Sequence, residues 1–413
     1  MAKPKIRFNG YQDDWEQRKL SELTTMHARI GWQNLRTSEF LDSGDYMLIT
    51  GTDFNDGAID YSTCHYVEKE RYEQDKNIQI RNGSILITKD GTLGKVAYVQ
   101  GLTMPATLNA GVFNVEIKDE NIADEKFLYQ YLKAPFLMDY VSKKATGGTI
   151  KHLNQSILID FPIAMPKKEE QVEIGNYFQS LDHLITLHQR KCDETKKLKK
   201  YMLQKMFPQN GKSVPEIRFS EFTDDWEQRK LKEIADKVSE KNKNNEFSEP
   251  FTNSAEQGII SQKDYFDREI VNNENLDGYY IVRNDDFIYN PRISVTAPVG
   301  PINRNRLGRN GVMSPLYTVF RTHDIDNLYL EFYFKTTKWH RFMKLNGDSG
   351  ARFDRFTISS TQFMEMPIPY PTLEEQRKIG EHFDALDHLI TLHQRKCDEL
   401  QNIKKYMLQN MFV

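Results

Sequence analysis

The sequence contains a long internal duplication, which constrains the fold more than any other feature. Residues 6–20, IRFNGYQDDWEQRKL, recur as IRFSEFTDDWEQRKL at residues 217–231. Residues 181–194, LDHLITLHQRKCDE, recur unchanged at residues 386–399. A repeat of this length indicates a duplicated domain and excludes a solenoid of short repeats.

Between the matched blocks the two halves differ almost completely. Residues 21–160 share little with residues 232–365. Gene duplication followed by drift is the simplest alternative, but even drift would not keep one segment identical while its neighbour lost all likeness. We therefore interpret the chain as two nearly identical frames that hold two different inserts.

Each half ends in a long helical pattern. Apolar and small polar residues recur at spacings of three and four, which predicts a helix that packs along a partner helix. We expect the two helices to form an antiparallel coiled coil with pseudo-twofold symmetry. Thr372 and Glu375 predict a capping box at the start of the second helix. The predicted packing positions are Phe178, Leu181, Ile185, His188, Cys192, Thr195, Lys199 and Met202, and then Phe383, Leu386, Ile390, His393, Cys397, Leu400, Lys404 and Met407.

The two inserts have the pattern of mixed α/β domains with short strands. Apolar runs bounded by turn residues predict the strands, and a period near 3.6 predicts the helices. In the first insert we expect strands at 46–50, 83–88, 95–100 and 112–117 and a helix near 125–141; in the second, strands at 279–283, 286–290 and 316–321 and a helix around 327–344.

The repeated blocks resemble the conserved regions of type I restriction-modification specificity subunits, the HsdS family. The resemblance rests on DWEQRKL in each half and on the segments that lead into the helices, FPIAMPKKEEQ at 161–171 and MPIPYPTLEEQ at 366–376. Lys167 departs from the usual pattern at the first helix entry. The resemblance implies a first target-recognition domain at 1–165, a central conserved long helix at 166–210, a second target-recognition domain at 211–370 and a distal conserved long helix at 371–413.

The resemblance also implies a function. A specificity subunit reads a bipartite double-stranded DNA target with an unread spacer and is not catalytic alone. The implied partners are two methyltransferase subunits, which bring S-adenosylmethionine and modify adenines, and restriction-translocase subunits, which use ATP and Mg²⁺. The alternative from another class is a stand-alone coiled-coil DNA-binding adaptor or regulator. A fused restriction-methylation enzyme is disfavoured because the sequence has no Pro-Pro pair for an adenine-methyltransferase loop.

Basic and glycine-rich stretches in the inserts are the candidate DNA contacts, because arginine and lysine bind phosphates and guanine edges. For each residue the simpler alternative is a solvated surface charge. In the first insert the candidates are Lys89, Lys95, Lys143, Lys144, Thr146, Gly147, Gly148, Lys151 and His152. In the second they are Arg292, Arg304, Arg306, Arg309, Arg341, Lys344, Ser349, Gly350, Arg352 and Arg355.

Composition narrows the remaining possibilities. The net charge is −3, so any DNA-binding charge must be local or shared with partners. The three cysteines form no Cys-x-x-Cys pair, which disfavours a zinc cluster and fits a cytoplasmic protein. No apolar run approaches the length of a membrane span, and no phosphate-binding loop has the required spacing. We expect no metal and no cofactor in this chain.

Overall fold

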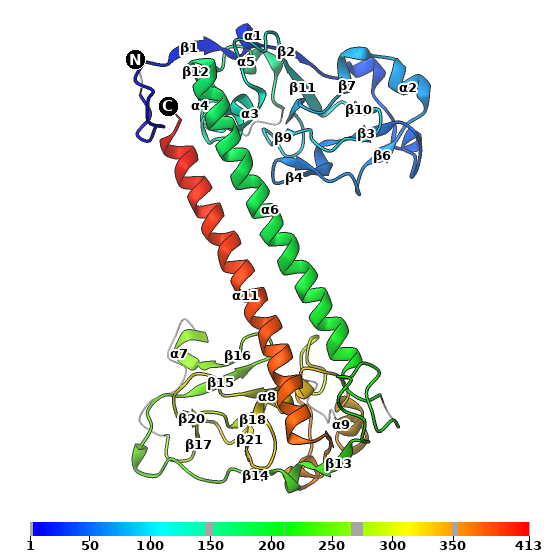
Figure 1. Cartoon of the computed structure of the whole chain (residues 1–413), viewed down its shortest axis with the longest axis vertical. Coiled ribbons are helices and arrows are strands. Elements are labelled where there is room, and N and C mark those ends of the chain that lie inside the picture. The colour runs from blue at the N-terminus through cyan, green and yellow to red at the C-terminus, as the bar shows by residue number, and fades with distance from the viewer. Residues whose placement is uncertain (1–2, 145–151, 210, 266–275, 349–353, 413) are drawn as a thin grey trace. The chain divides into compact units, whose positions relative to one another are not determined.

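The two predicted long helices are present in the computed structural model of the chain (Figure 1). Helix α6 (Lys168–Lys205) and helix α11 (Leu373–Asn410) each contain 38 residues. The structure describes residues 3–144, 152–209, 211–265, 276–348 and 354–412. Within these residues, no helix is both long enough and apolar enough to cross a membrane.

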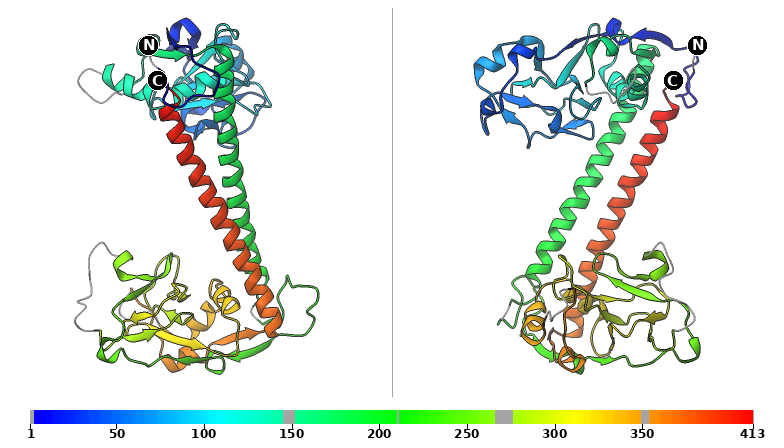
Figure 2. Two further views of the ribbon diagram at one scale, coloured as in Figure 1. Left: turned by 60° about the vertical axis from the view of Figure 1, so that its left-hand side comes forward. Right: turned by 180° about the vertical axis from the view of Figure 1, so that it is seen from behind.

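The chain divides into two compact units that do not follow chain order. Unit 1 contains residues Met1–Gln189 and Arg395–Val413, and unit 2 contains Arg190–Gln394. Each unit therefore combines segments from both halves of the sequence. In unit 1 the first and last segments lie side by side, since the Ile6 N–H donates to the Asn410 carbonyl at 3.0 Å (Figure 2).

Unit 1 contains two four-stranded sheets. The first has the order β2-β11-β8-β9 and is antiparallel; the second has the order β6-β3-β10-β7, in which β10 runs parallel to β3. A separate ribbon pairs β1 with β12. The bounds are β1 (Glu16–Lys19), β2 (Thr24–His27), β3 (Met47–Ile49), β6 (His65–Tyr66), β7 (Gln79–Ile80), β8 (Ile85–Thr88), β9 (Val96–Tyr98), β10 (Ala106–Leu108), β11 (Val112–Ile117), β12 (Pro162–Met165), α3 (Glu125–Lys133) and α4 (Phe136–Lys144).

Unit 2 repeats one four-stranded sheet, with the order β14-β21-β18-β19, and the ribbon that pairs β13 with β22. Its remaining strands form the pairs β15-β16 and β17-β20, which a parallel bridge between Pro250 and Val312 joins in the order β16-β15-β20-β17, the same topology as the second sheet of unit 1. The bounds are β13 (Glu227–Lys230), β14 (Ala235–Lys237), β15 (Phe251–Ser254), β16 (Gly258–Ser261), β17 (Tyr280–Val282), β18 (Phe287–Tyr289), β19 (Ile302–Arg304), β20 (Gly311–Met313), β21 (Thr318–Thr322), β22 (Pro367–Tyr370), α8 (Asn327–Phe334), α9 (His340–Asn346) and α10 (Ser360–Met364).

The predicted strands are confirmed, but each predicted insert helix is broken in two. The expected helix near 125–141 is divided into α3 and α4, because Pro135 has no N–H to donate and disfavours a helical residue before it. The expected helix around 327–344 is divided into α8 and α9. There the Thr336 hydroxyl donates to the Tyr333 carbonyl at 2.7 Å, which competes with the helical backbone pattern.

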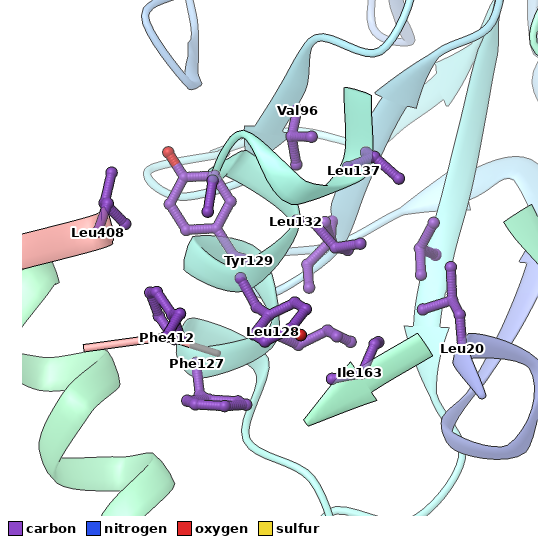
Figure 3. Packing of buried hydrophobic residues seen from close by; sticks show 14 of the residues in the cluster. Leu20, Val96, Phe127, Leu128, Tyr129, Leu132, Leu137, Ile163, Leu408 and Phe412 are labelled. Carbon is purple, nitrogen blue, oxygen red and sulfur yellow. The ribbon is translucent and has the colours of Figure 1, made fainter. Parts of the chain in front are cut away.

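In each unit, a phenylalanine that follows a long helix packs into the hydrophobic core. In unit 1, Phe412 stacks on Phe178 with ring centroids 5.5 Å apart and packs against Phe127 of α3 (Figure 3). In unit 2, Phe207 stacks on Phe383 at 6.1 Å and packs against Tyr329 of α8. Burial of such aromatic side chains is a large apolar contribution to stability. The repeated Met-Phe pair after each helix therefore completes the hydrophobic core of its unit.

Candidate nucleic-acid interface

A buried ion pair fixes the start of each long helix to the segment before the first strand of its frame. In unit 1 the Arg7 Nε lies 2.7 Å from the Glu170 Oε1, and in unit 2 the Arg218 Nε lies 2.7 Å from the Glu375 Oε1. Both carboxylates are 1% exposed. Only half of the predicted capping box is formed. The Glu375 N–H donates to the Thr372 hydroxyl, but the Glu375 carboxylate binds Arg218 instead of the helix start.

The long helices α6 and α11 also bind the insert helices α3 and α8, through glutamines at equivalent positions. Gln171 of α6 accepts a hydrogen bond from the Asp124 N–H at 2.9 Å, and Gln376 of α11 accepts one from the Asp326 N–H at 2.9 Å. Asp124 and Asp326 cap α3 and α8. Each insert is therefore attached to its long helix through the residue that caps its own helix, α3 or α8. The attachment is the same in both units.

These contacts bring α3 and α8 very close to the long helices. A Cβ built on Gly175 would lie 2.9 Å from the Phe127 nitrogen, and one on Gly380 would lie 2.6 Å from the Leu328 Cβ. Both distances are shorter than ordinary van der Waals contact. Glycine is therefore required at these two helix positions by close packing.

The predicted seam between the long helices is confirmed within each unit. In unit 1 Lys404 pairs with Asp182, and in unit 2 the Lys199 Nζ lies 2.5 Å from the Asp387 Oδ1, so α6 and α11 run antiparallel in both. Buried seam residues are Phe178, Leu181, Ile185, Cys192, Phe383, Leu386, Cys397, Leu400 and Lys404. Those that are half-buried are His188, Thr195, Lys199, Met202, Ile390, His393 and Met407.

The candidate DNA contacts of the first insert are in different environments. Lys95 and Lys143 are exposed, and neither forms an ion pair with a described residue. Lys89 is half-buried with its Nζ 5.5 Å from the Phe113 ring centroid, and the Lys144 Nζ lies 5.7 Å from that of Tyr140. The His152 Nδ1 is 2.5 Å from the Asp90 Oδ1. Thr146, Gly147, Gly148 and Lys151 lie outside the described residues.

Three candidate arginines of the second insert already have acidic partners in unit 2. The Nε atoms of Arg304 and Arg306 each lie 2.8 Å from the Glu331 Oε2. Arg306 also reaches Asp384 of α11 at 3.0 Å. Arg304 is only 10% exposed, so this side chain is placed to support the insert.

The third of these arginines lies nearer the surface. Arg309 forms two hydrogen bonds of 2.8 Å to Glu249, which hold the pKa of that carboxyl below its ordinary value. A phosphate would have to compete with Glu249 for this guanidinium. DNA contact by Arg304, Arg306 and Arg309 stays a prediction, now with intramolecular competitors.

The other candidates of the second insert are freer. Arg292, Arg341 and Lys344 are exposed and form no ion pair with a described residue. Arg355 is half-buried, with its Nε 3.7 Å from the Asp354 Oδ2, and its backbone forms a bridge with that of Arg292. Ser349, Gly350 and Arg352 lie outside the described residues.

A set of exposed apolar side chains on the long helices was not predicted. Exposed apolar side chains that cluster on a helix surface are typical of partner contacts, whereas isolated ones are common on any protein. The duplicated sequence contained the signal, because Leu184 and Leu389, and Tyr201 and Tyr406, occupy equivalent exposed places outside the seam. We call this set the apolar helix surface: Leu184, Ile403 and Tyr406 in unit 1 and Leu198, Tyr201, Leu389 and Leu392 in unit 2.

Among the described residues, no group of three or more histidine, cysteine, aspartate or glutamate side chains is arranged to hold a metal ion. Several of the buried carboxylates there, such as Glu375 and Glu331, are paired with arginine instead.

Comparisons with known proteins all identify the same family. A family model described as the type I restriction modification DNA specificity domain matches residues 12–197 and 223–402. The MjaX type I restriction enzyme specificity subunit of Methanocaldococcus jannaschii is 26% identical, over 98% of this chain and 94% of that protein. The MjaVIII specificity subunit of the same organism is 23% identical, over 95% of each chain.

A solved structure has a similar fold. The crystal structure of the type I restriction-modification S subunit from M. genitalium superimposes with a TM-score of 0.62 at 17% sequence identity, covering 100% of this chain and 99% of that one. The likeness therefore extends over both units and both long helices.

Proposed function

This chain belongs to the family of type I restriction-modification DNA specificity subunits, and from this premise we propose that its two units recognise two different parts of one DNA target. A subunit of this family recognises the DNA sequence and is not catalytic by itself. The modification and cleavage of DNA are therefore reactions of partner subunits that this chain directs.

One observation carries the division of labour: equivalent frames hold unlike inserts. The Arg7–Glu170 and Arg218–Glu375 ion pairs have the same geometry. The inserts that these frames support differ in sequence, since residues 21–160 share little with residues 232–365. Base edges are read by side chains on such variable surfaces. Two unlike surfaces are expected to read two unlike half-sites.

The exposed cations without ion-pair partners are the residues best placed for DNA contact. Arg292 is the strongest candidate in unit 2, because a free guanidinium can bind a guanine edge or a phosphate through two hydrogen bonds. Lys95 and Lys143 are the corresponding candidates in unit 1. Positive charge of this local kind allows a chain with a net charge of −3 to take part in DNA binding.

The chain acts within a type I restriction-modification complex, and the finer assignment of its partners is part of our proposal. Two methyltransferase subunits would cover the apolar helix surface, one on each unit, because equivalent leucine and tyrosine residues are exposed on both. Restriction-translocase subunits would join the same complex. S-adenosylmethionine, ATP and Mg²⁺ would be held by these partners, and the cytoplasm would be the site of action.

The long helices would set the length of the unread spacer. At about 1.5 Å per residue, a helix of 38 residues is about 57 Å long. The ion pairs in each seam, Lys404–Asp182 and Lys199–Asp387, would resist sliding of one helix past the other. Half-site spacing follows from such geometry.

Replacing Arg292 with alanine tests the proposed reading surface. In cells that carry the partner subunits, modified adenines are mapped by long-read sequencing. We expect Arg292→Ala to relax base preference at one position in one half-site, by about 1–3 kcal/mol of discrimination. Arg283→Ala is the matched control, because the Arg283 guanidinium is already paired with Glu240 at 3.2 Å. A recognition motif that is the same in the Arg292 variant and the intact chain would remove Arg292 from the reading surface.

A further inference from the structure

A pocket in unit 2 combines an apolar floor with a cationic rim. Its volume is about 550 Å³. The walls come from the segment that follows α6, from the β13-β22 ribbon and from α9. Apolar and aromatic residues form much of the lining, among them Pro208, Trp226, Tyr333, Trp339, Phe342 and Leu345. A cavity of this size suits one or two side chains of a bound segment.

Three cations line this pocket without an ion-pair partner among the described residues: Lys212, Lys338 and Arg341. Burial and the neighbouring Lys205 lower the pKa of Lys338. The acid in the lining, Glu227, already accepts a hydrogen bond from Arg229 at 3.0 Å. The pocket therefore has an excess of positive charge that an incoming anion would balance.

The rim also exposes an apolar side chain that the fold does not use. Leu345, at the end of α9, is 74% exposed, although a leucine of this kind is usually covered. An exposed leucine beside a proline- and aromatic-lined floor is typical of a contact surface for another protein.

We propose that this pocket binds an acidic segment of a partner protein, with an apolar side chain seated on the floor and flanking carboxylates paired with Lys212, Lys338 and Arg341. Binding of such a segment would be independent of the reading of DNA bases. A nucleobase is a poorer occupant, because it needs an open aromatic face for stacking. The indoles of Trp226 and Trp339 are only 6% and 2% exposed.

Synthetic peptides test the required chemistry with the full chain. The probe is a fluorescein-labelled hexapeptide, Glu-Glu-Leu-Phe-Glu-Glu, and binding is followed by fluorescence anisotropy. We expect this peptide to bind at least about tenfold more tightly than its Lys-Lys-Leu-Phe-Lys-Lys and Glu-Glu-Ser-Ser-Glu-Glu counterparts. Equal binding of the three peptides, or no binding of the first, would overturn the proposal.

Substitutions locate the peptide on the chain. The double variant Lys338→Gln, Arg341→Gln should weaken binding of the acidic peptide at least about tenfold. The control Lys243→Gln, Arg377→Gln removes the same charge from exposed residues outside the pocket and should leave affinity unchanged. If the first double variant unfolds, as judged by circular dichroism, Leu345→Ser replaces it and should also weaken binding.

A competition experiment separates the peptide from nucleic acid. A short duplex of random sequence is added to the complex of chain and acidic peptide. We expect it to leave the peptide bound. If the duplex displaces the peptide, and if its own binding is lost in the Lys338→Gln, Arg341→Gln variant, the pocket is a nucleic-acid site and the proposal is wrong.

Discussion

Units 1 and 2 share a frame and a strand order but present different side chains on them. Both are closed by a stacked phenylalanine pair, Phe178–Phe412 and Phe207–Phe383. Both begin a long helix with a buried glutamate. Even the second sheet keeps its strand order, β6-β3-β10-β7 in unit 1 and β16-β15-β20-β17 in unit 2, but the residues on it differ. Most residues that pack the long helices together are the same in both halves of the sequence, while the residues of the inserts have changed.

The frames also differ in one buried contact. In unit 2 the Trp226 indole donates a hydrogen bond to the Glu375 carboxylate at 3.1 Å. In unit 1 the Trp15 Nε1 is buried and has no hydrogen-bond partner among the described residues. Glu170 therefore relies on Arg7, whereas Glu375 has Trp226 in addition to Arg218. Two frames with nearly the same sequence thus stabilise a buried carboxylate to different extents.

Removal of each arginine measures this difference and gives the largest expected effect. Arg7→Met leaves the Glu170 carboxylate buried without a cation and should lower the free energy of unfolding of unit 1 by about 3–5 kcal/mol. Arg218→Met should cost unit 2 about 1 kcal/mol less, because Trp226 still donates. Urea denaturation provides both values. Arg18→Met is the control, since its partner Glu16 is exposed. Equal losses in the two units would contradict the assigned role of Trp226.

Replacing Gly175 and Gly380 with alanine tests whether the long helices pack equally closely against α3 and α8. In an open helix, glycine to alanine stabilises by about 1 kcal/mol. Gly175→Ala and Gly380→Ala should instead each destabilise their unit by about 1–3 kcal/mol, because the added carbon meets α3 or α8. Thermal unfolding reports the change. Gly278→Ala, where the added carbon meets no atom of the described residues within 4 Å, should change stability by less than about 0.5 kcal/mol. A stabilising effect at either helix position would show that the close approach is wrong.

Acidification should destabilise unit 2 more than unit 1, and this is the smallest of the three expected effects. Burial, with a contribution from Lys344, lowers the pKa of His340 to about 4, and burial also lowers the pKa of His382; both residues are in unit 2. Between pH 6.5 and 4 the unfolded chain therefore binds more protons than the folded unit, so the stability of unit 2 falls as pH drops through this window. Melting temperatures at pH 7 and pH 5 measure the loss. The variant His340→Gln should lose less on acidification; a loss equal to that of the intact chain would contradict the role of His340.

The frame was predictable from the sequence because its residues occur twice. Identity over 181–194 and 386–399 marked the helices, and seam residues such as Phe178 and Phe383 followed from their spacing. The exchange of helix ends between units was not predicted, because periodicity does not indicate which core Phe412 enters. Breaks at Pro135 and Thr336 were missed because the apolar pattern continues across them.

The reading surface was less predictable than the frame. Basic residues in a glycine-rich stretch suggested DNA contact equally for Arg292 and Arg304. Only the fold places Glu331 and Asp285 beside Arg304 and leaves Arg292 exposed. Partners that lie far away in the sequence decide whether a cation is available to a phosphate.

Transplantation of one insert tests the division of labour most directly. Residues 21–160 are replaced by the corresponding insert of a family member with a different first half-site, and modified adenines are mapped by long-read sequencing in cells with the partner subunits. If each unit reads its own half-site, one half of the methylated motif changes, while the other half and the spacer stay the same. A motif that changes in both halves, or in neither, would contradict separate reading by the two units.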